Sequence, residues 1–369
     1  MTISVWSYLK EYEAEKAEVQ QALETVFRSG RLILGESVKA FEQEFAAWCG
    51  AGFGVGVNSG TDAIFLALKA LGIGPGDEVI TTSNTAVPTV SAIVSTGATP
   101  RFVDIDPATY LMDVSQLEGA VTPRTRCLLP VHLFGQCVPM EEVTRVARKH
   151  GLKVVEDCAQ SHGAKRNGQR CGSLADLAPF SFYPTKILGT YGDGGMVVGR
   201  DEELAARLRR LRFYGMEKTY FSIEHGYNSR LDELHAEILR RKMRHLDGYI
   251  VRRQELARRY DRALADTSLV LPRTAPGNEH AFYLYVARHA QRDRIIRELA
   301  KRDIVVNVSY PWPIHTMPAY EHLGYEVGSL PHTEQAANEI FSLPMYPTLS
   351  DAEQETVCTA LHEILRAIG

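Results

Sequence analysis

The stretch GVGVNSGTDAIFLALKAL, residues 54–71, decides the fold class. Its first four residues form a short run typical of a buried strand, and residues 61–71 have the apolar spacing of a helix. A turn of small residues, Asn58 to Thr61, joins the two segments. A strand that leads through a small-residue turn directly into a helix is the repeating half of an α/β sheet.

The same alternation of strand and helix patterns continues to about residue 211. Further strand patterns lie at residues 78–82, 101–103, 127–131, 153–155, 179–182 and 196–198, and helix patterns lie at 87–95, 140–150 and 201–211. Several strand runs are continuously apolar, as expected where helices cover both faces of a parallel sheet. We therefore expect an α/β fold with a doubly wound, mostly parallel sheet in a large domain at residues 1–248.

The rest of the chain predicts a second, smaller domain of the α+β class at residues 249–369. One long helical pattern, from residue 229 to about 264, bridges the two domains. Beyond it lie apolar runs at residues 281–286 and 304–308 and helix patterns at 292–301, 333–340 and 351–368. The first 45 residues also have mostly helical spacing, with an exposed-looking apolar connector at residues 31–34.

The composition narrows the class of protein. Hydrophobic residues make up 45% of the chain, charged residues 23%, and the formal net charge is -4. This balance is typical of a globular protein, and the lack of a basic excess argues against nucleic acid as a partner. No apolar run approaches the roughly 20 residues that span a membrane, and residues 1–13 lack the pattern of a signal peptide. We therefore expect a cytoplasmic protein without a membrane partner.

The cysteines predict neither a metal site nor a disulfide. There are six of them, at positions 49, 127, 137, 158, 171 and 358, and no two form a Cys-x-x-Cys pair. Scattered cysteines of this kind are typical of buried, unpaired thiols in a reducing compartment.

Polar groups follow three of the predicted strands, where ligands bind in open α/β sheets. Ser59, Gly60 and Thr61 open a helix whose free N–H groups favour an anion such as phosphate. Asp157 follows the strand at residues 153–155. Lys186 follows the strand at 179–182 and precedes a glycine-rich turn at 189–195. Each feature alone has an ordinary structural explanation, as a helix cap or a solvated lysine.

Together, the three features meet the needs of pyridoxal 5'-phosphate. Helix N–H groups bind its phosphate, a lysine forms a Schiff base with its aldehyde, and a carboxylate keeps its ring nitrogen protonated. The turn at 189–195 lacks the Gly-Lys-Ser/Thr ending of a nucleotide-binding P-loop. The glycines at 52, 54 and 56 precede or lie within a strand, so they do not form a nicotinamide-binding turn.

Four motifs in fixed order resemble those of the DegT-type (DegT/DnrJ/StrS) nucleotide-sugar aminotransferases, which are pyridoxal-phosphate enzymes of fold type I. They are NSGTDA at 58–63, EDCAQSHG at 156–163, FYPTK at 182–186 with GDGG at 192–195, and YNSRLDE at 227–233. The resemblance spans roughly residues 4–365. It implies a homodimer whose two active sites are shared between the subunits.

The resemblance also implies roles for individual residues. Lys186 is the Schiff-base lysine and proton carrier, and Asp157 pairs with the pyridine nitrogen. Gln160 lies beside the ring oxygen and the ring face. His162 is a candidate for orienting the Asp157 segment, and a purely structural role is equally open. Relatives with histidine in place of the lysine catalyse a dehydration, and Lys186 argues against that branch.

The same resemblance implies which residues bind the phosphate group. They are Ser59, Gly60 and Thr61 in one segment, Ser181 in a second, and Asn228 of the neighbouring subunit. One departure concerns the cofactor ring. Many relatives place an aromatic residue on the ring face where this chain has Ala86, so either Thr85 or Ala86 covers that face here.

Substrate contacts are expected from Tyr183, Tyr310 and His315. The segment YPWPIH at 310–315 has two prolines and three ring side chains that could stack on a sugar or a nucleobase, although such loops also serve as hydrophobic plugs. His132 follows a strand and is either a cavity residue or a hydrogen-bonded structural histidine.

The expected function is the transfer of an amino group from glutamate to a dTDP-3-keto-6-deoxyhexose, giving a dTDP-3-amino-3,6-dideoxyhexose. Residues 5–13 and 307–317 are similar to those of enzymes that make 3-amino-3,6-dideoxy sugars. A 4-keto-sugar aminotransferase of the same family is the first alternative. The second is a non-catalytic, sugar-sensing regulatory protein, which would usually lose the lysine or gain a DNA-binding module.

Overall fold

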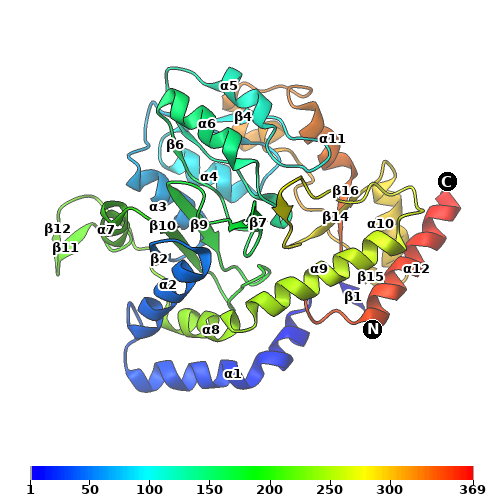
Figure 1. Ribbon diagram of the computed structural model, residues 1–369, viewed down its shortest axis with the longest axis horizontal. Helices are drawn as coiled ribbons and strands as arrows, with labels where there is room; N and C mark the ends of the chain where they lie inside the picture. Colours follow the sequence, from blue (N-terminus) through cyan, green and yellow to red (C-terminus); the bar gives the residue numbers. More distant parts are fainter. Residues whose placement is uncertain (1, 369) are drawn as a thin grey trace.

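A seven-stranded sheet forms the centre of the larger part of the chain in the computed structural model, which describes residues 2–368 (Figure 1). Its strands are β2 (Phe53–Val57), β3 (Glu78–Thr82), β4 (Thr99–Val103), β5 (Thr125–Leu128), β6 (Lys153–Val154), β9 (Leu177–Ser181) and β10 (Gly195–Gly199). A parallel bridge between Val155 and Leu177 joins two ladders into the order β4-β3-β5-β6-β9-β10-β2. Only β10 runs against the other six strands.

This sheet confirms the prediction of a mostly parallel α/β fold. The strand at β3 has the predicted bounds, and most of the others differ by one or two residues. The exception is β5, which was expected at residues 127–131 and instead occupies Thr125–Leu128. Pro130 has no N–H to donate to a neighbouring strand, so the ladder cannot continue past it in regular form. Val131 forms only an isolated bridge, to Asp157.

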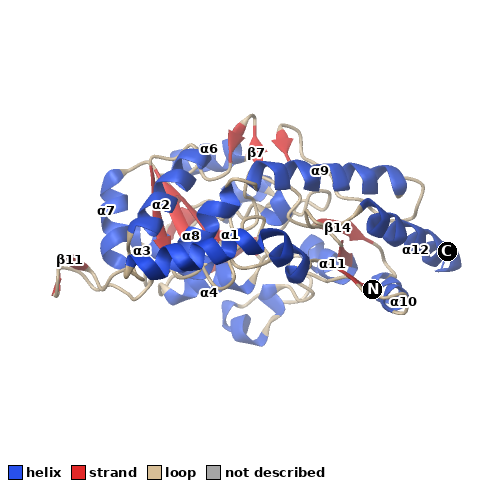
Figure 2. Cartoon of the chain, turned by 90° about the horizontal axis from the view of Figure 1, so that it is seen from below, coloured by secondary structure: helices blue, strands red, loops and turns tan. Residues whose placement is uncertain are grey.

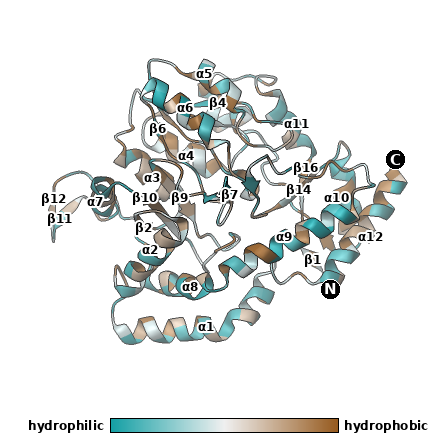
Figure 3. Cartoon of the chain, viewed as in Figure 1, coloured by the Kyte–Doolittle hydropathy of each residue, from teal (hydrophilic) through white to brown (hydrophobic). Residues whose placement is uncertain are grey.

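Helices cover the sheet. They are α2 (Glu36–Cys49), α3 (Gly60–Ala70), α4 (Val87–Ser95), α5 (Leu117–Ala120), α6 (Met140–His150) and α7 (Glu202–Leu211). Helix α3 packs on β9 and β10, α6 on β5 and β6, and α2 and α7 on β2. Along α6, hydrophobic and hydrophilic residues alternate at helical spacing (Figure 3), and its buried residues are Met140, Val143, Val146 and Ala147. The apolar stripe explains why this segment folds as a helix against the sheet.

The bridging segment contains two helices, where the sequence predicted one. Helix α8 (Glu233–Met243) packs on α1 (Tyr8–Ser29) and on α2, and α9 (Leu246–Ala263) continues toward the C-terminal elements. The N–H groups of Arg244 and His245 bond to carbonyls three residues earlier, which tightens the chain into a turn. The expected domain boundary, between residues 248 and 249, lies near the start of α9.

The C-terminal elements form a second hydrophobic cluster, centred on buried side chains that include Tyr260, Tyr285, Phe341 and Leu361. These elements are β14 (Tyr285–Arg288), α10 (Arg292–Ala300), β15 (Ile304–Val305), α11 (Pro331–Glu339), β16 (Ile340–Leu343) and α12 (Asp351–Ile368). Strand β14 pairs with β16, and β15 pairs with β1 (Ile3–Ser4). The first strand of the chain therefore lies among the last elements.

Short hairpins and turns complete the fold. Strands β7 (Lys165–Arg166) and β8 (Gln169–Arg170) pair with each other, and β7 also pairs with β13 (Asn278–Glu279). Strands β11 (Met216–Lys218) and β12 (Phe221–Ser222) form a hairpin that projects from one end of the molecule (Figures 1 and 2). Short 3-10 helices lie at Val114–Gln116, Leu133–Gly135, Ile314–Thr316 and Pro318–Leu323. Among residues 2–368, no helix is long and apolar enough to cross a membrane.

The expectation of six unpaired cysteines is wrong for two of them. Cys137 and Cys171 form a disulfide, whereas the other four are free and buried, as predicted. The fold brings the pair together because Cys171 ends the β7–β8 hairpin, where its N–H bonds to the carbonyl of Ala164. Thirty-four residues separate the two cysteines, and spacing alone did not reveal this contact.

Candidate active site

A cavity of about 310 Å³ lies where the carboxyl ends of β2, β6 and β9 meet. These strands run in the same direction, so the residues that follow them gather at one edge of the sheet. The cavity is lined by most of the predicted site residues: Ser59, Gly60, Thr61, Asp157, Gln160, Ser181, Tyr183 and Lys186. Thr85, Ala86, Pro88 and Thr89 complete one wall, and no aromatic residue stands in place of Ala86.

The N-terminus of α3 forms one end of this cavity. The Ser59 side chain accepts a hydrogen bond from the Asp62 N–H at 3.1 Å, and its carbonyl accepts one from the Ala63 N–H. The first-turn N–H groups of Gly60 and Thr61 have no carbonyl four residues earlier within the helix, so they are available to a ligand. A Cβ added to Gly60 would lie 2.6 Å from the Cβ of Ser181. This close approach of a small residue to Ser181 forms a cradle whose free N–H groups favour an anion.

Asp157 is a fixed and buried carboxylate in the cavity wall. Its Oδ1 accepts the N–H of Ala159 at 3.0 Å, and its Oδ2 accepts the hydroxyl of Thr89 at 2.9 Å. Burial raises the pKa of this carboxyl, although those two hydrogen bonds and the charges of Lys186 and His132 partly oppose the rise. A buried carboxylate of this kind is stabilised by a cationic partner, which is what a protonated ring nitrogen supplies.

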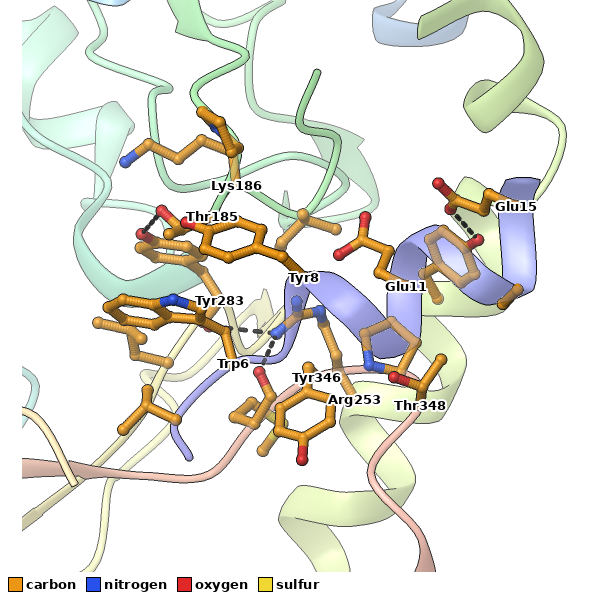
Figure 4. A pocket seen from close by; sticks show the side chains of 18 residues that line it. Trp6, Tyr8, Glu11, Glu15, Thr185, Lys186, Arg253, Tyr283, Tyr346 and Thr348 are labelled. Atoms are coloured by element: carbon orange, nitrogen blue, oxygen red, sulfur yellow. Dashed lines mark hydrogen bonds between the residues drawn. The ribbon is translucent and has the colours of Figure 1, made fainter. Parts of the chain in front are cut away.

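Lys186 lies between the cavity and a wall of aromatic residues. Its Nζ lies 4.7 Å from the centre of the Tyr283 ring, and the Tyr283 hydroxyl is 3.0 Å from that of Thr185. A second, smaller hollow of about 30 Å³ adjoins Lys186 and is lined by Trp6 and Tyr8, among others (Figure 4). The N-terminal segment, far away in sequence, therefore forms part of the surroundings of the lysine.

Gln160 has both ends of its amide occupied by protein groups. Its Oε1 accepts the N–H of Phe134 at 2.8 Å, and its Nε2 donates to the hydroxyl oxygen of Tyr310 at 2.5 Å. Tyr310 was expected to contact the substrate, but it lies behind Gln160 and is not among the described residues that line the cavity. Its ring is stacked on that of Phe134, with the ring centres 6.2 Å apart.

The three histidines singled out in the sequence are buried away from the cavity. His162 packs against the rings of Phe45, Phe180 and Phe182, and burial, together with the charge of Lys186, lowers its pKa to about 3. His162 is not among the described residues that line the cavity, and neither of its ring nitrogens has a hydrogen-bond partner there, so its packing fits the structural alternative and not a catalytic role.

His315 and His132 have hydrogen-bond partners that fix them in the core. The Nδ1 of His315 lies 2.8 Å from the Ser83 hydroxyl, and its Nε2 lies 3.1 Å from Glu334. The Nδ1 of His132 accepts the N–H of Val138, and its Nε2 lies 2.9 Å from Glu156. His315 was expected to contact the substrate, but the structure places it outside the cavity. For His132, the structure agrees with the alternative of a hydrogen-bonded structural histidine.

Asn228 lies outside its own chain's cavity. Its side chain is exposed, whereas the neighbouring Ser229 is buried and donates a hydrogen bond to Asp62 at 2.6 Å. The Ser229 hydroxyl also accepts the N–H of Asn58 at 3.2 Å. Ser229 thus holds the turn that leads into α3, and Asn228 faces outward.

Four residues near the site were not predicted from the sequence: Thr89, Phe134, Trp6 and Tyr8. Thr89, which fixes Asp157, lies in the first turn of the helix after β3, and the rule of strand ends could have found it. Phe134 holds Gln160 through a backbone N–H, which leaves no signal in the sequence. Trp6 and Tyr8 approach Lys186 only because the N-terminal segment packs beside it.

The fold and the cavity together define a class. A mostly parallel α/β sheet with a helix N-terminus, a buried aspartate and a lysine at one edge is the arrangement of a fold type I pyridoxal-phosphate enzyme. The family model of the DegT/DnrJ/EryC1/StrS aminotransferases matches residues 13–362. The chain belongs to this family, and it is a pyridoxal-phosphate-dependent nucleotide-sugar transaminase.

Individual relatives cover the whole chain. A protein of Micromonospora megalomicea subsp. nigra named dTDP-3-amino-3,4,6-trideoxy-alpha-D-glucose transaminase is 54% identical over 374 residues, covering 100% of both chains. A "pleiotropic regulatory protein" of Geobacillus stearothermophilus is 44% identical over 99% of both. The crystal structure of S. venezuelae DesV in complex with a ketimine intermediate superposes with a TM-score of 0.96, at 44% identity and 98% coverage of both chains.

The residues present fit pyridoxal 5'-phosphate. The cradle at Gly60 and Ser181 suits a phosphate, and the buried Asp157 lacks a cation at the distance of a hydrogen bond among the described residues. Lys186 borders the same cavity, whose volume of about 310 Å³ lies within the range of small-molecule sites.

Proposed function

We propose that this enzyme transfers the amino group of glutamate to carbon 3 of a dTDP-3-keto-6-deoxyhexose, giving a dTDP-3-amino-3,6-dideoxyhexose. The observation that carries the proposal is the 54% identity, over the full chain, to a transaminase named for a dTDP-3-amino sugar. The sugar in the name of that relative also lacks the hydroxyl at carbon 4. Two substrates therefore agree with the proposal: a 3-keto-6-deoxy sugar that keeps the carbon 4 hydroxyl, and a 3-keto-4,6-dideoxy sugar that lacks it.

The chain's own residues would divide the work as follows. Pyridoxal phosphate, when bound, would supply an aldehyde that takes up and gives back the amino group and a ring that accepts electrons while a proton is moved. Gly60, Thr61 and Ser181 would hold its phosphate, and Asp157 would keep the proton on its ring nitrogen. The Lys186 amine would carry the cofactor at rest and then move a proton at its Nζ between donor, cofactor and sugar carbons.

The substrate pocket is proposed to lie on the side of the cavity that Tyr183 lines. Tyr183 is partly exposed and borders both the cavity and the solvent, so its hydroxyl is free to meet a sugar or a phosphate. The wall opposite, at Ala86, leaves more room over the ring face than an aromatic residue would. Tyr183 remains the expected substrate contact, and the amine acceptor enters from the solvent side.

Product analysis tests the position of amination. The purified enzyme is incubated with glutamate labelled with nitrogen-15 and with either a dTDP-3-keto- or a dTDP-4-keto-6-deoxyhexose. We expect the label at carbon 3, seen by mass spectrometry and NMR, and a kcat/KM for the 4-keto sugar that is lower by at least about tenfold, since misplacing one polar group costs about 1.4 kcal/mol or more. A higher kcat/KM with the 4-keto sugar would favour the first alternative.

The regulatory alternative makes a different prediction for the same experiment. A non-catalytic sugar sensor would bind the nucleotide sugar without transferring nitrogen, and the visible colour of the lysine-bound cofactor would persist when glutamate is added. The regulatory name of one relative at 44% identity motivates this comparison. The retained Lys186 and Asp157 favour the enzyme, because a sensor needs neither of them.

We further propose that the enzyme is a homodimer and that Asn228 contacts the phosphate bound by the other subunit. Exposed apolar side chains support an interface: Phe27 and Leu32 at the end of α1 and in the connector, and Tyr220 and Phe221 at the tip of the β11–β12 hairpin. Tyr220 is 92% exposed, which is unusual for a large ring without a partner. The connector at residues 31–34 is exposed at Leu32 and Ile33, as predicted.

Mixing two inactive variants tests the shared site. One chain carries Lys186→Ala and the other Asn228→Glu, which places a negative charge beside the phosphate and should weaken its binding by like-charge repulsion. Each variant alone should be inactive. After subunit exchange, about half of the dimers are mixed and each has one intact site, so about a quarter of the wild-type activity should return.

A second mixture serves as the control for complementation. Lys186 and Asp157 line the same cavity of one chain, so a mixture of Lys186→Ala with Asp157→Asn leaves a defect in every site and should recover no activity. Subunit exchange is verified with two different affinity tags. If the first mixture stays inactive although tagged hetero-oligomers form, Asn228 does not serve the partner's site.

A further inference from the structure

The orientation of Gln160 is set by two aromatic residues from distant parts of the chain. The N–H of Phe134 binds the amide oxygen of Gln160, and the hydroxyl oxygen of Tyr310 binds one of its two amide N–H groups. Phe134 lies between β5 and α6, and Tyr310 lies 150 residues beyond Gln160, in the C-terminal part of the chain. Because Gln160 lines the cavity, its remaining N–H is the one donor of the amide left to meet an acceptor on a ligand there.

Both partners have a backbone conformation that is rare for large side chains. The φ angle of Phe134 is 58° and that of Tyr310 is 63°, in the left-handed region that non-glycine residues seldom adopt. Their rings are stacked, with an angle of 13° between the planes. Residues in such conformations persist only where their surroundings hold them, and they are concentrated at functional sites.

The segment that carries Tyr310 is also fixed at its other end. The N–H of Ile314 bonds to the carbonyl of Ser83, and the N–H of His315 bonds to the Ser83 hydroxyl at 3.0 Å. Ser83 directly follows β3. The segment at 310–315 is therefore attached to the edge of the central sheet at two points, Gln160 and Ser83, which holds the Tyr310 hydroxyl in place.

We propose that Tyr310 is a positioning residue, whose hydroxyl oxygen holds the Gln160 amide so that its second N–H points at the cofactor's ring oxygen. The inference rests on the proposed cofactor and on the role that we expect for Gln160 beside that oxygen. It changes the expected role of Tyr310 from stacking on the substrate to orienting a cofactor contact. It also gives the strained pair of aromatic residues a function.

The visible absorption of the bound cofactor reports on this contact. A hydrogen bond to the ring oxygen stabilises its deprotonated form, so losing the bond raises the pH at which the lysine-bound cofactor loses its proton. In Tyr310→Phe, which keeps the ring and the stacking, we expect this midpoint to rise by about half a unit, the shift that corresponds to one ordinary hydrogen bond. Spectra are recorded across a pH series without substrate, so the readout does not depend on turnover.

A double-mutant cycle separates positioning from a general structural effect. Gln160→Leu should raise the midpoint at least as much, and adding Tyr310→Phe to it should cause no further rise, because the amide through which Tyr310 acts is gone. Tyr320→Phe is the matched control: it removes another buried tyrosine hydroxyl from the same C-terminal region, one that has no contact with Gln160, and should leave the midpoint unchanged. If Tyr310→Phe folds poorly, Tyr310→Met takes its place. It also lacks the hydroxyl that holds Gln160, so we expect the same rise in the midpoint.

The outcomes of this cycle are distinct. An unchanged midpoint in Tyr310→Phe, or an equal shift in the presence and absence of Gln160, overturns the positioning role while leaving the proposed function intact. A wild-type protein that shows no visible band with pyridoxal phosphate overturns the proposed function, and this inference with it.

Discussion

Replacing Lys186 with alanine is expected to abolish transamination while the protein still binds the cofactor. Lys186 borders the cavity at the end of β9, and no other described lysine lines that cavity. Loss of both the covalent attachment and the proton carrier should lower kcat by at least about 10⁴-fold, the upper range for general acid–base catalysis alone. The rate of nitrogen-15 transfer from glutamate measures the loss.

Cofactor binding separates a chemical defect from an unfolded protein. The cradle at Gly60 and Ser181 is untouched in Lys186→Ala, so the variant should still bind pyridoxamine phosphate, measured by calorimetry. Lys165→Ala, at a lysine paired with Glu279 in the β7–β13 region, is the control for removing a lysine side chain elsewhere. Turnover near the wild-type rate in Lys186→Ala would remove the assignment of this lysine as the cofactor-bearing residue.

Asp157→Asn is expected to keep the fold and lose most of the activity. An amide has nearly the same shape as the carboxylate but carries no charge, so it cannot sustain a protonated ring nitrogen. Loss of a charge-assisted contact on the scale of ~3 kcal/mol lowers the rate by two orders of magnitude or more. Single-turnover kinetics with glutamate measure the loss at the step in which the amino group leaves the donor.

The surroundings of Asp157 supply the controls for that variant. Asparagine can still accept the N–H of Ala159 through its oxygen, so thermal unfolding should change little. Burial raises the pKa of Asp157, so its net surroundings do not favour the charge, and the amide of asparagine can still bond to the Thr89 hydroxyl by donating to its oxygen. Retention of the wild-type rate by Asp157→Asn would mean that another group holds the ring nitrogen.

Much of the site could be predicted because its parts follow a local rule. Ser59, Gly60, Asp157 and Lys186 each lie within five residues of the end of a strand, and parallel strands end at one edge of a sheet whatever their order. The sequence therefore placed them together without any knowledge of which strands are neighbours. The same rule would have identified Thr89, since α4 follows β3.

Contacts between remote segments could not be predicted in this way. His162 belongs to a motif beside Asp157, yet the adjacent peptide turns it into a cluster with Phe45, Phe180 and Phe182. Cys137 and Cys171 meet because a hairpin folds back on the loop after β5. In neither case do the neighbouring residues in the sequence indicate which side chains the histidine or the cysteine will contact.

The sequence by itself determined the α/β class and the family, and it supplied the roles proposed for Asp157 and Lys186, because strand and helix periodicity and the residues at strand ends are properties of short segments. The tertiary structure alone decided what surrounds those groups. Tyr310 is bonded to Gln160, and Trp6 and Tyr8 lie beside Lys186, only because the N-terminal segment and the segment at 310–315 pack next to the cavity. Such contacts depend on the summed packing of the whole chain, and no local pattern of residues encodes them.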